Sequence, residues 1–157
     1  MYKRQEQALL DSAIPFNLDQ WDGYEYERDQ LLRHAVDVGS HLVVLAGDTH
    51  NAWSSQLTTP EGAIAGVEFG CCSVTSDGFE GSLGEDAATL FAPLAANLID
   101  DLVRANLKNR GYLYLEFTAE EVRASHRFIT TVQSRDYALD AGATINHAVP
   151  RDTMLLT

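Results

Sequence analysis

A short apolar run, His41-Leu42-Val43-Val44-Leu45-Ala46, constrains the fold of this chain more than any other feature. A run of this length and composition, bounded by polar residues, predicts a buried strand. A helical pattern that begins at Trp21-Asp22-Gly23-Tyr24 and ends at Gly39-Ser40 comes directly before it. A helix that leads straight into a buried strand is half of a β-α-β crossover, so the sequence predicts an α/β arrangement. The strand expected before the helix is not evident, which indicates that an upstream element is missing.

Polar residues follow this strand at once, in the segment Gly47-Asp48-Thr49-His50-Asn51-Ala52. In open α/β sheets, ligands bind outside the carboxyl ends of the strands. A carboxylate and an imidazole suit hard or borderline metal ions, so Asp48 and His50 are candidate metal ligands. The alternative interpretation of this pair is a turn aspartate and a structural histidine. The D-x-H spacing alone favours that alternative.

The remaining patterns alternate between strand and helix. Strands are expected at 52–58 and 63–73, and a hairpin at 111–117 and 122–132. Residues 77–85 are expected to form a loop, and 86–108 helical stretches that are broken near Pro93. The tail from residue 133 is weakly patterned, and both strand and loop remain open. The fold class expected is α/β moving into α+β, a layered sandwich with a mixed sheet and flanking helices.

Composition excludes some classes of partner. The chain has 157 residues, 23 of them acidic and 11 basic, and a formal net charge of −12. Such a surface repels nucleic acid and anionic membranes, so we expect no nucleic-acid partner. No apolar stretch is long enough to span a bilayer, and the start does not resemble a signal peptide. We therefore expect a soluble chain of undetermined compartment. Cys71 and Cys72 are adjacent, and neighbouring strand residues point to opposite faces, so we expect no disulfide.

Two other segments carry candidate functional groups. Asp22, at the start of the first helix, is either a helix N-cap or a third ligand delivered into the same crevice. Asp19 is a weaker candidate for the same role. The strand ending in Ser73-Val74-Thr75-Ser76 could place hydroxyl groups and backbone amides near a bound oxyanion. Buried strand packing is the alternative for most of that segment.

These motifs occur in an order that resembles a known family. The patterns W-D-G-Y-x-x-x-R, G-D-T-H-N-A-W and V-E-F-x-x-x-S-V-T-S resemble the C-terminal part of the PhoD-like alkaline phosphatases. The later R-G-Y-L and V-R-A segments are similar to the closing hairpin of that family. The resemblance runs over residues 17–132 of what we expect to be a single domain, 1–157, with 133–157 as its tail.

The resemblance implies a fold, a reaction and a set of ligands. The family has the four-layer metallophosphoesterase sandwich, in which mixed β-sheets are flanked by helices. It hydrolyses phosphate monoesters and diesters at a two-metal centre of iron and calcium, and its members are often secreted. By this match Asp48 and His50 are catalytic metal ligands, and Asp22 is a further ligand or its support. The residues that bind substrate stay undetermined.

The chain departs from the family in one large respect. The upstream motifs, which supply a cysteine, an aspartate, a tyrosine and an asparagine, have no counterpart before Asn17, and Cys71 and Cys72 do not match that cysteine. We therefore expect an incomplete centre that binds metal weakly and is inactive in isolation. A homodimer or a complementing N-terminal segment is the expected partner. The alternative is a non-catalytic remnant, an interaction domain that keeps the fold without the chemistry.

Overall fold

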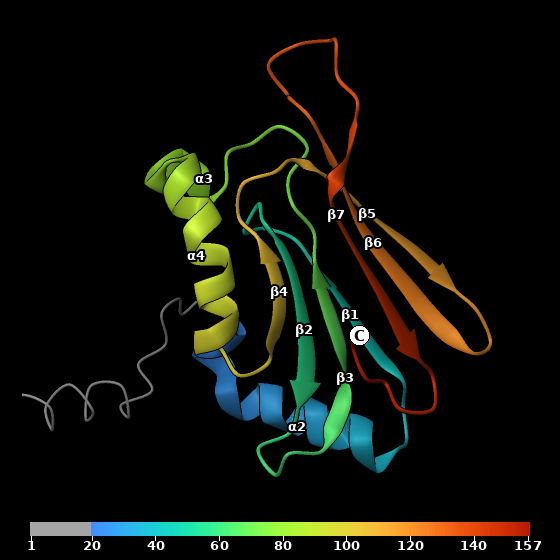
Figure 1. Cartoon of the computed structure of the whole chain (residues 1–157). Helices are drawn as coiled ribbons and strands as arrows, with labels where there is room; N and C mark the ends of the chain where they lie inside the picture. Colours follow the sequence, from blue (N-terminus) through green and yellow to red (C-terminus); the bar gives the residue numbers. More distant parts are fainter. Residues whose placement is uncertain (1–19) are drawn as a thin grey trace, which may run out of the picture.

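The computed structural model describes residues 20–157, which form two β-sheets and a set of helices (Figure 1). The elements in chain order are η1 (Trp21–Tyr24), α2 (Glu25–Asp37), β1 (Leu42–Ala46), β2 (Ala52–Thr58), β3 (Ile64–Gly70), α3 (Phe79–Leu83), α4 (Glu85–Leu98), β4 (Leu102–Asn106), β5 (Gly111–Phe117), β6 (Glu121–Ile129) and β7 (Leu139–Pro150). Asp19 lies outside the described residues.

The first sheet is mixed, as the sequence predicts. Its strand order is β1-β3-β2-β4, with β1 and β3 parallel and the other neighbouring pairs antiparallel. The second sheet, β5-β6-β7, is antiparallel throughout. The predicted strand at 41–46 and the predicted hairpin are confirmed. The open question about the tail is answered, since residues 139–150 form β7 and pair with β6.

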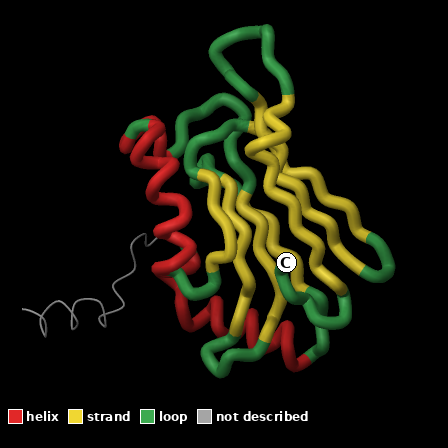
Figure 2. The backbone as a smooth tube through the Cα atoms, viewed as in Figure 1, coloured by secondary structure: helices red, strands yellow, loops and turns green. Residues whose placement is uncertain are grey.

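The first sheet lies between helices on one side and the second sheet on the other (Figures 1 and 2). Val67 and Phe69 of β3 are fully buried against Ala124 and Val149 of the second sheet. On the opposite face, α2 packs on the sheet through a separate buried cluster. This cluster consists of Leu32, Ala35, Leu57 and Ala65. Burial of apolar side chains on both faces explains why these strands are nearly continuous apolar runs.

The parallel pair β1 and β3 is closely packed. Leu42 pairs with Gly66 and Ala46 pairs with Gly70. A side chain at position 66 would collide with the carbonyl oxygen of Leu42, so only glycine fits there. Because both strands run in the same direction, their carboxyl ends meet at one edge of the sheet. That edge carries the predicted metal ligands.

The prediction for residues 86–108 was wrong in two ways. The helix α4 continues through Pro93, and it ends at Leu98. Residues 102–106 form the edge strand β4, which pairs with β2. The physical reason is backbone pairing, because Leu102 pairs with Ser55 and Asn106 with Ala52, and these ladder hydrogen bonds outweigh the helical spacing of the apolar residues. A short helix, α3, also lies in the expected loop 77–85.

The predicted N-cap position of Asp22 was also wrong. Asp22 is the second residue of the 3-10 turn η1, whose capping residue is Gln20, and α2 begins only at Glu25. The structure does not describe the side chain of Asp22. Within residues 20–157, no helix is long and apolar enough to cross a membrane.

Candidate functional site

The segment that carries Asp48 and His50 lies at the carboxyl ends of β1 and β3. The amide of Cys71 donates to the carbonyl of Ala46 at 2.8 Å, which continues the pairing past the end of both strands. The amide of Ser73 then donates to the carbonyl of His50 at 3.4 Å. The predicted position of this segment, directly past a parallel strand, is therefore confirmed, and it is where α/β sheets bind ligands.

The backbone of this loop is strained. Asp48 has a φ of 67° and His50 a φ of 58°, and Met154 is the one other non-glycine residue with positive φ in the described part of the chain. The left-handed region is unfavourable for residues with a Cβ, although Asp and His enter it more readily than most. Strained backbone of this kind is concentrated at functional sites, where the side chain must be held in one direction.

The ring of His50 is oriented by the backbone. Its Nδ1 lies 2.7 Å from the carbonyl oxygen of Asp77. A carbonyl can only accept, so Nδ1 carries the hydrogen, and in the neutral ring the lone pair is on Nε2. Histidine ligands of metals almost always donate their second nitrogen to such an acceptor. His50 is half-buried and Asp48 is exposed, so the donor set of this loop fits one end of a metal site.

Arg110 stabilises the backbone of the loop that carries Asp48 and His50. Its Nη1 donates to the carbonyl oxygens of His50 and Asn109, both at 3.0 Å. Its guanidinium also forms an ion pair with Glu80 of α3. Arg110 is buried, and burial lowers its pKa because a charged group is disfavoured away from water. The resemblance placed Arg110 in the closing hairpin, and its contact with the loop that carries Asp48 and His50 was not predicted.

Trp53 and Asn51 hold the other side of the loop. The indole Nε1 of Trp53 donates to Oγ1 of Thr49 at 2.8 Å, and its ring packs edge-to-face on Phe79 at 6.2 Å between centroids. Asn51 is fully buried, and its Oδ1 accepts from the amide of Phe79 at 3.3 Å. Asp48 and His50 thus project from a loop whose neighbours are fixed on both sides.

The described residues do not complete a metal centre. Within 20–157, no group of three or more His, Cys, Asp or Glu side chains is placed to hold a metal ion. Asp48 and His50 remain two donors, and the third predicted ligand, Asp22, has no described side chain. Cys71 and Cys72 are free thiols in the described structure. A hydrogen bond from the neighbouring Cys72 lowers the pKa of Cys71 to about 6.

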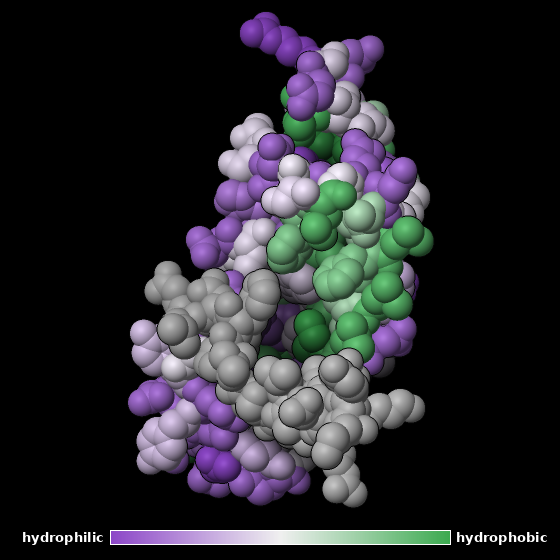
Figure 3. Space-filling view, turned by 90° about the vertical axis from the view of Figure 1, so that its left-hand side faces the viewer, coloured by the Kyte–Doolittle hydropathy of each residue, from purple (hydrophilic) through white to green (hydrophobic). Residues whose placement is uncertain are grey.

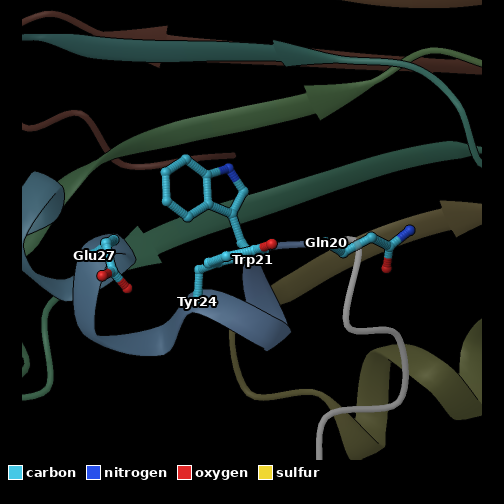
Figure 4. Close-up of a pocket in the computed structure, with 4 residues that line it drawn as sticks. All are labelled: Gln20, Trp21, Tyr24 and Glu27. Carbon is cyan, nitrogen blue, oxygen red and sulfur yellow. The ribbon is translucent and has the colours of Figure 1, made fainter.

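Two surface hollows lie away from this loop. One, of about 380 Å³, is lined by Gln20, Trp21, Tyr24 and Glu27 at the start of the first helix (Figure 4). The other, of about 540 Å³, is lined by α4, β4 and the beginning of β7. Neither of the two includes Asp48 or His50 among its lining residues. Beside the first hollow, Nη2 of Arg28 donates to Oδ2 of Asp101 at 3.0 Å, which ties α2 to the turn after α4.

Comparisons with known proteins agree with the motifs. The sequence model of a family described as PhoD-like phosphatase matches residues 1–126. The chain is 36% identical over 73 residues to alkaline phosphatase D of Bacillus subtilis (strain 168). The aligned region covers 43% of this chain and 12% of that protein. A solved structure described as "Structure of PhoD" aligns with a TM-score of 0.71 and 24% identity, over 90% of this chain and 26% of that chain. The match to the solved structure shows the fold alone. The chain spans 12% of the length of the Bacillus protein and 26% of the length of the solved chain.

Proposed function

The chain belongs to the PhoD-like phosphatase family, and we propose that it supplies the C-terminal, ligand-bearing part of a phosphate-ester hydrolase. The observation that carries the proposal is the orientation of His50, whose Nδ1 is engaged by the carbonyl of Asp77 at 2.7 Å beside Asp48. This arrangement leaves Nε2 free to bind a cation. The φ of 58° at His50 supports the proposal, because strained backbone is concentrated at functional sites.

Three residues would hold the metal ions, namely Asp48, His50 and, as a further ligand, Asp22. When bound, a pair of ions, iron and calcium by resemblance, supplies Lewis-acid polarisation and charge neutralisation for attack on a phosphate ester. The chain's own residues position the candidate ligand His50. The carbonyl of Asp77 fixes the tautomer of His50, and Arg110 holds the His50 carbonyl in place.

We further propose that the two sheets form one domain, part of a larger four-layer sandwich. The coverage of the relatives supports this proposal, since the chain matches 90% of its own length but 26% of the solved chain. Two donors offset the desolvation of an ion poorly, so the isolated chain should bind metal weakly and lack activity. A second copy or a complementing N-terminal segment of the family would then be the partner that completes the centre.

The second candidate function is a non-catalytic interaction domain. It is favoured by the finding that no three metal-binding side chains converge within residues 20–157. The two candidates differ in one measurable property, because only the first requires that the Asp48–His50 loop bind a cation.

Metal titration of the full chain separates them. Calorimetry with calcium and with ferrous iron under anaerobic conditions should show weak binding that is lost in Asp48→Asn and in His50→Asn. His34→Asn, in an exposed part of α2, is the control and should bind as the wild type does. Absence of binding in the wild type, or equal binding by all three variants, favours the interaction domain. Hydrolysis of an aryl phosphate by the chain mixed with an upstream family segment then tests the reaction itself.

A further inference from the structure

The short helix α3 directs its single carboxylate, Glu80, toward the interior. Glu80 pairs with Arg110, and the two side chains are only 14% and 6% exposed. The apolar Leu83 of the same helix is 51% exposed, and no residue of α3 is buried. Figure 3 shows hydrophobic side chains gathered on the outer face that carries α3 and α4. Removing a carboxylate from water is costly unless polar partners replace the water, so the partners of Glu80 account for its direction.

Glu80 contacts the same peptide group that orients His50. The amide of Gly78 donates to both carboxylate oxygens of Glu80, each at 3.2 Å. The carbonyl of that peptide group belongs to Asp77, and it accepts from Nδ1 of His50 at 2.7 Å. The N–H and the C=O of one peptide group are conjugated, and chains of hydrogen bonds polarise one another. The carboxylate at the N–H therefore makes the carbonyl a stronger acceptor for the imidazole.

A second path joins Glu80 to the main chain of His50. The guanidinium of Arg110 pairs with Glu80, and its Nη1 donates to the carbonyl of His50 at 3.0 Å. One carboxylate is thus connected to His50 twice, through the ring and through the backbone. The two paths meet only at Glu80.

The turn between Glu80 and His50 is closely packed. A Cβ at position 78 would collide with the side-chain amide of Asn51, which is fully buried, so only glycine fits there. The amide of Phe79 also donates to Oδ1 of Asn51 at 3.3 Å. The peptide group between Asp77 and Gly78 is therefore held in one orientation, as a relay between two side chains requires.

We propose that Glu80 is a positioning residue for the candidate metal site. It favours the tautomer in which Nδ1 of His50 carries the hydrogen and Nε2 is free for a cation. In many metal sites a carboxylate accepts directly from the second nitrogen of the histidine ligand. Here one peptide group lies between the carboxylate and the ring. The proposal rests on the proposed function in that a cation binds His50, whereas the effect of Glu80 on the ring does not.

Nitrogen-15 NMR of the full chain, labelled at histidine, measures the tautomer of His50 without any metal. The signals of His50 are those that disappear in His50→Asn, and spectra are recorded at about pH 8, where free imidazole is neutral. In Glu80→Gln the ratio of the Nε2–H to the Nδ1–H form should rise at least about threefold, as one weakened hydrogen bond allows. Glu85→Gln is the matched control, because it removes the same charge from an exposed ion pair with Lys108. It should keep the wild-type ratio.

Glu80→Asp provides a second variant. It keeps the charge opposite Arg110 but shortens the side chain, so its carboxylate cannot contact the guanidinium and the Gly78 amide together. The tautomer ratio of His50 should rise, by less than in Glu80→Gln. Circular dichroism checks the fold of each variant, and if Glu80→Gln does not fold, Glu80→Asp decides. A wild-type ratio in the folded variant overturns the inference, whatever its affinity for metal.

Anaerobic titration with ferrous iron separates the inference from the proposed function. Iron should bind Glu80→Gln about tenfold more weakly than the wild type, because the partners of a ligand tune its affinity. If the tautomer shifts but the wild type binds no iron, the proposed function fails and Glu80 still positions His50. If the wild type binds iron, and Glu80→Gln matches Glu85→Gln in both tautomer and affinity, the positioning role fails and the proposed function stands.

Discussion

Asp48 and His50 hold backbone angles that side chains with a Cβ seldom adopt, with φ of 67° and 58°. Such a residue costs on the order of 1–2 kcal/mol relative to an ordinary conformation. Glycine has no Cβ and so lacks this steric penalty, but it loses more conformational entropy on folding than other residues do. The loop therefore gives up stability in order to direct two potential ligands. That trade-off can be measured at Asp48, which is exposed and whose side chain contributes little packing.

We predict that Asp48→Gly stabilises the chain. The free energy of unfolding should rise by about 0.5 kcal/mol, the steric relief less the entropy cost of glycine. Urea denaturation measures it, and Asp100→Gly is the control. Asp100 is exposed and has no positive φ, so glycine there should destabilise. Destabilisation by Asp48→Gly would show that the side chain of Asp48 makes a stabilising contact in the folded chain.

Arg110 joins three parts of the molecule through one buried guanidinium. It donates to the carbonyls of His50 and Asn109 at 3.0 Å and pairs with Glu80. Lysine has a single ammonium group and lacks the planar fork needed to reach these acceptors together. The position is therefore sensitive even to a change that conserves charge.

We predict that Arg110→Lys lowers the free energy of unfolding by about 1–3 kcal/mol, the cost of leaving buried acceptors unpaired. Exchange of the amides near residues 47–51 should also accelerate, because the carbonyl of His50 loses a donor. The control is Arg135→Lys in an exposed loop, which should stay within about 0.5 kcal/mol of the wild type. An Arg110→Lys chain as stable as the control would mean that the guanidinium contributes only charge.

At the scale of elements, the sequence predicts β1 well because the evidence is local. Five apolar residues between a helix stop and a polar turn leave few alternatives to a buried strand. The same reasoning fails for residues 102–106. Leu102 and Val103 continue the apolar spacing of α4, and only the pairing of β4 with β2 decides in favour of a strand. Pairing between segments about fifty residues apart leaves no periodic signal in either of them.

The candidate site likewise contains residues whose positions the sequence predicts and residues whose positions it does not. The position of Asp48 and His50 could be predicted, because both follow a strand end that sequence patterns locate, while their role as metal ligands stays a prediction. Asp77 and Arg110 could not, because they act on His50 from 27 and 60 residues away. Each contact is made to a backbone carbonyl, that of Asp77 in one case and that of His50 in the other, and every residue has one, so no residue type indicates the contact. Asp22 stays a prediction, since its side chain is not described.

The interface between the two sheets contains two buried histidines. His126 bonds to the carbonyl of Gly70 at 3.0 Å and His147 to that of Thr157 at 2.9 Å, and both rings pack on Phe69. Burial lowers the pKa of both imidazoles below the ordinary value near 6.5. The unfolded chain therefore binds more protons than the folded chain as the pH falls below that value. This contribution to stability is present above pH 6.5 and is lost as the pH falls through the folded pKa.

We predict that the sheet interface weakens in mild acid and that His126→Gln reduces this dependence. The variant should be less stable than the wild type at pH 7, because packing against Phe69 is lost, and the difference should narrow towards pH 5. Urea denaturation at pH 5, 6 and 7 measures how the free energy of unfolding depends on pH in the wild type and in the variant. His34→Gln, exposed on α2, should keep the wild-type slope. A difference that stays constant with pH would mean that His126 is not the group that titrates.

For the whole molecule, the dominant quantity is the net charge of −12. The 11 Lys and Arg residues, some of which form surface ion pairs such as Arg33 with Glu61, are outnumbered roughly two to one by the 23 Asp and Glu residues. Repulsion among like charges disfavours the compact state, and it is screened over about 10 Å at 0.1 M salt. Each exposed ion pair contributes little to stability. Salt therefore lowers the free energy of unfolding less by screening the ion pairs than it raises it by screening the repulsion.

Salt should therefore stabilise the chain. Raising chloride from about 0.02 M to 0.5 M should increase Tm by about 2–4 °C, followed by circular dichroism. Tetramethylammonium chloride should act as sodium chloride does, because screening needs no bound cation, whereas a larger effect of sodium would indicate a specific site. Glu120→Lys/Asp136→Lys, both at exposed positions, should raise Tm at low salt and reduce the increase. A Tm that falls with salt would mean that attraction within the ion pairs outweighs repulsion among the carboxylates.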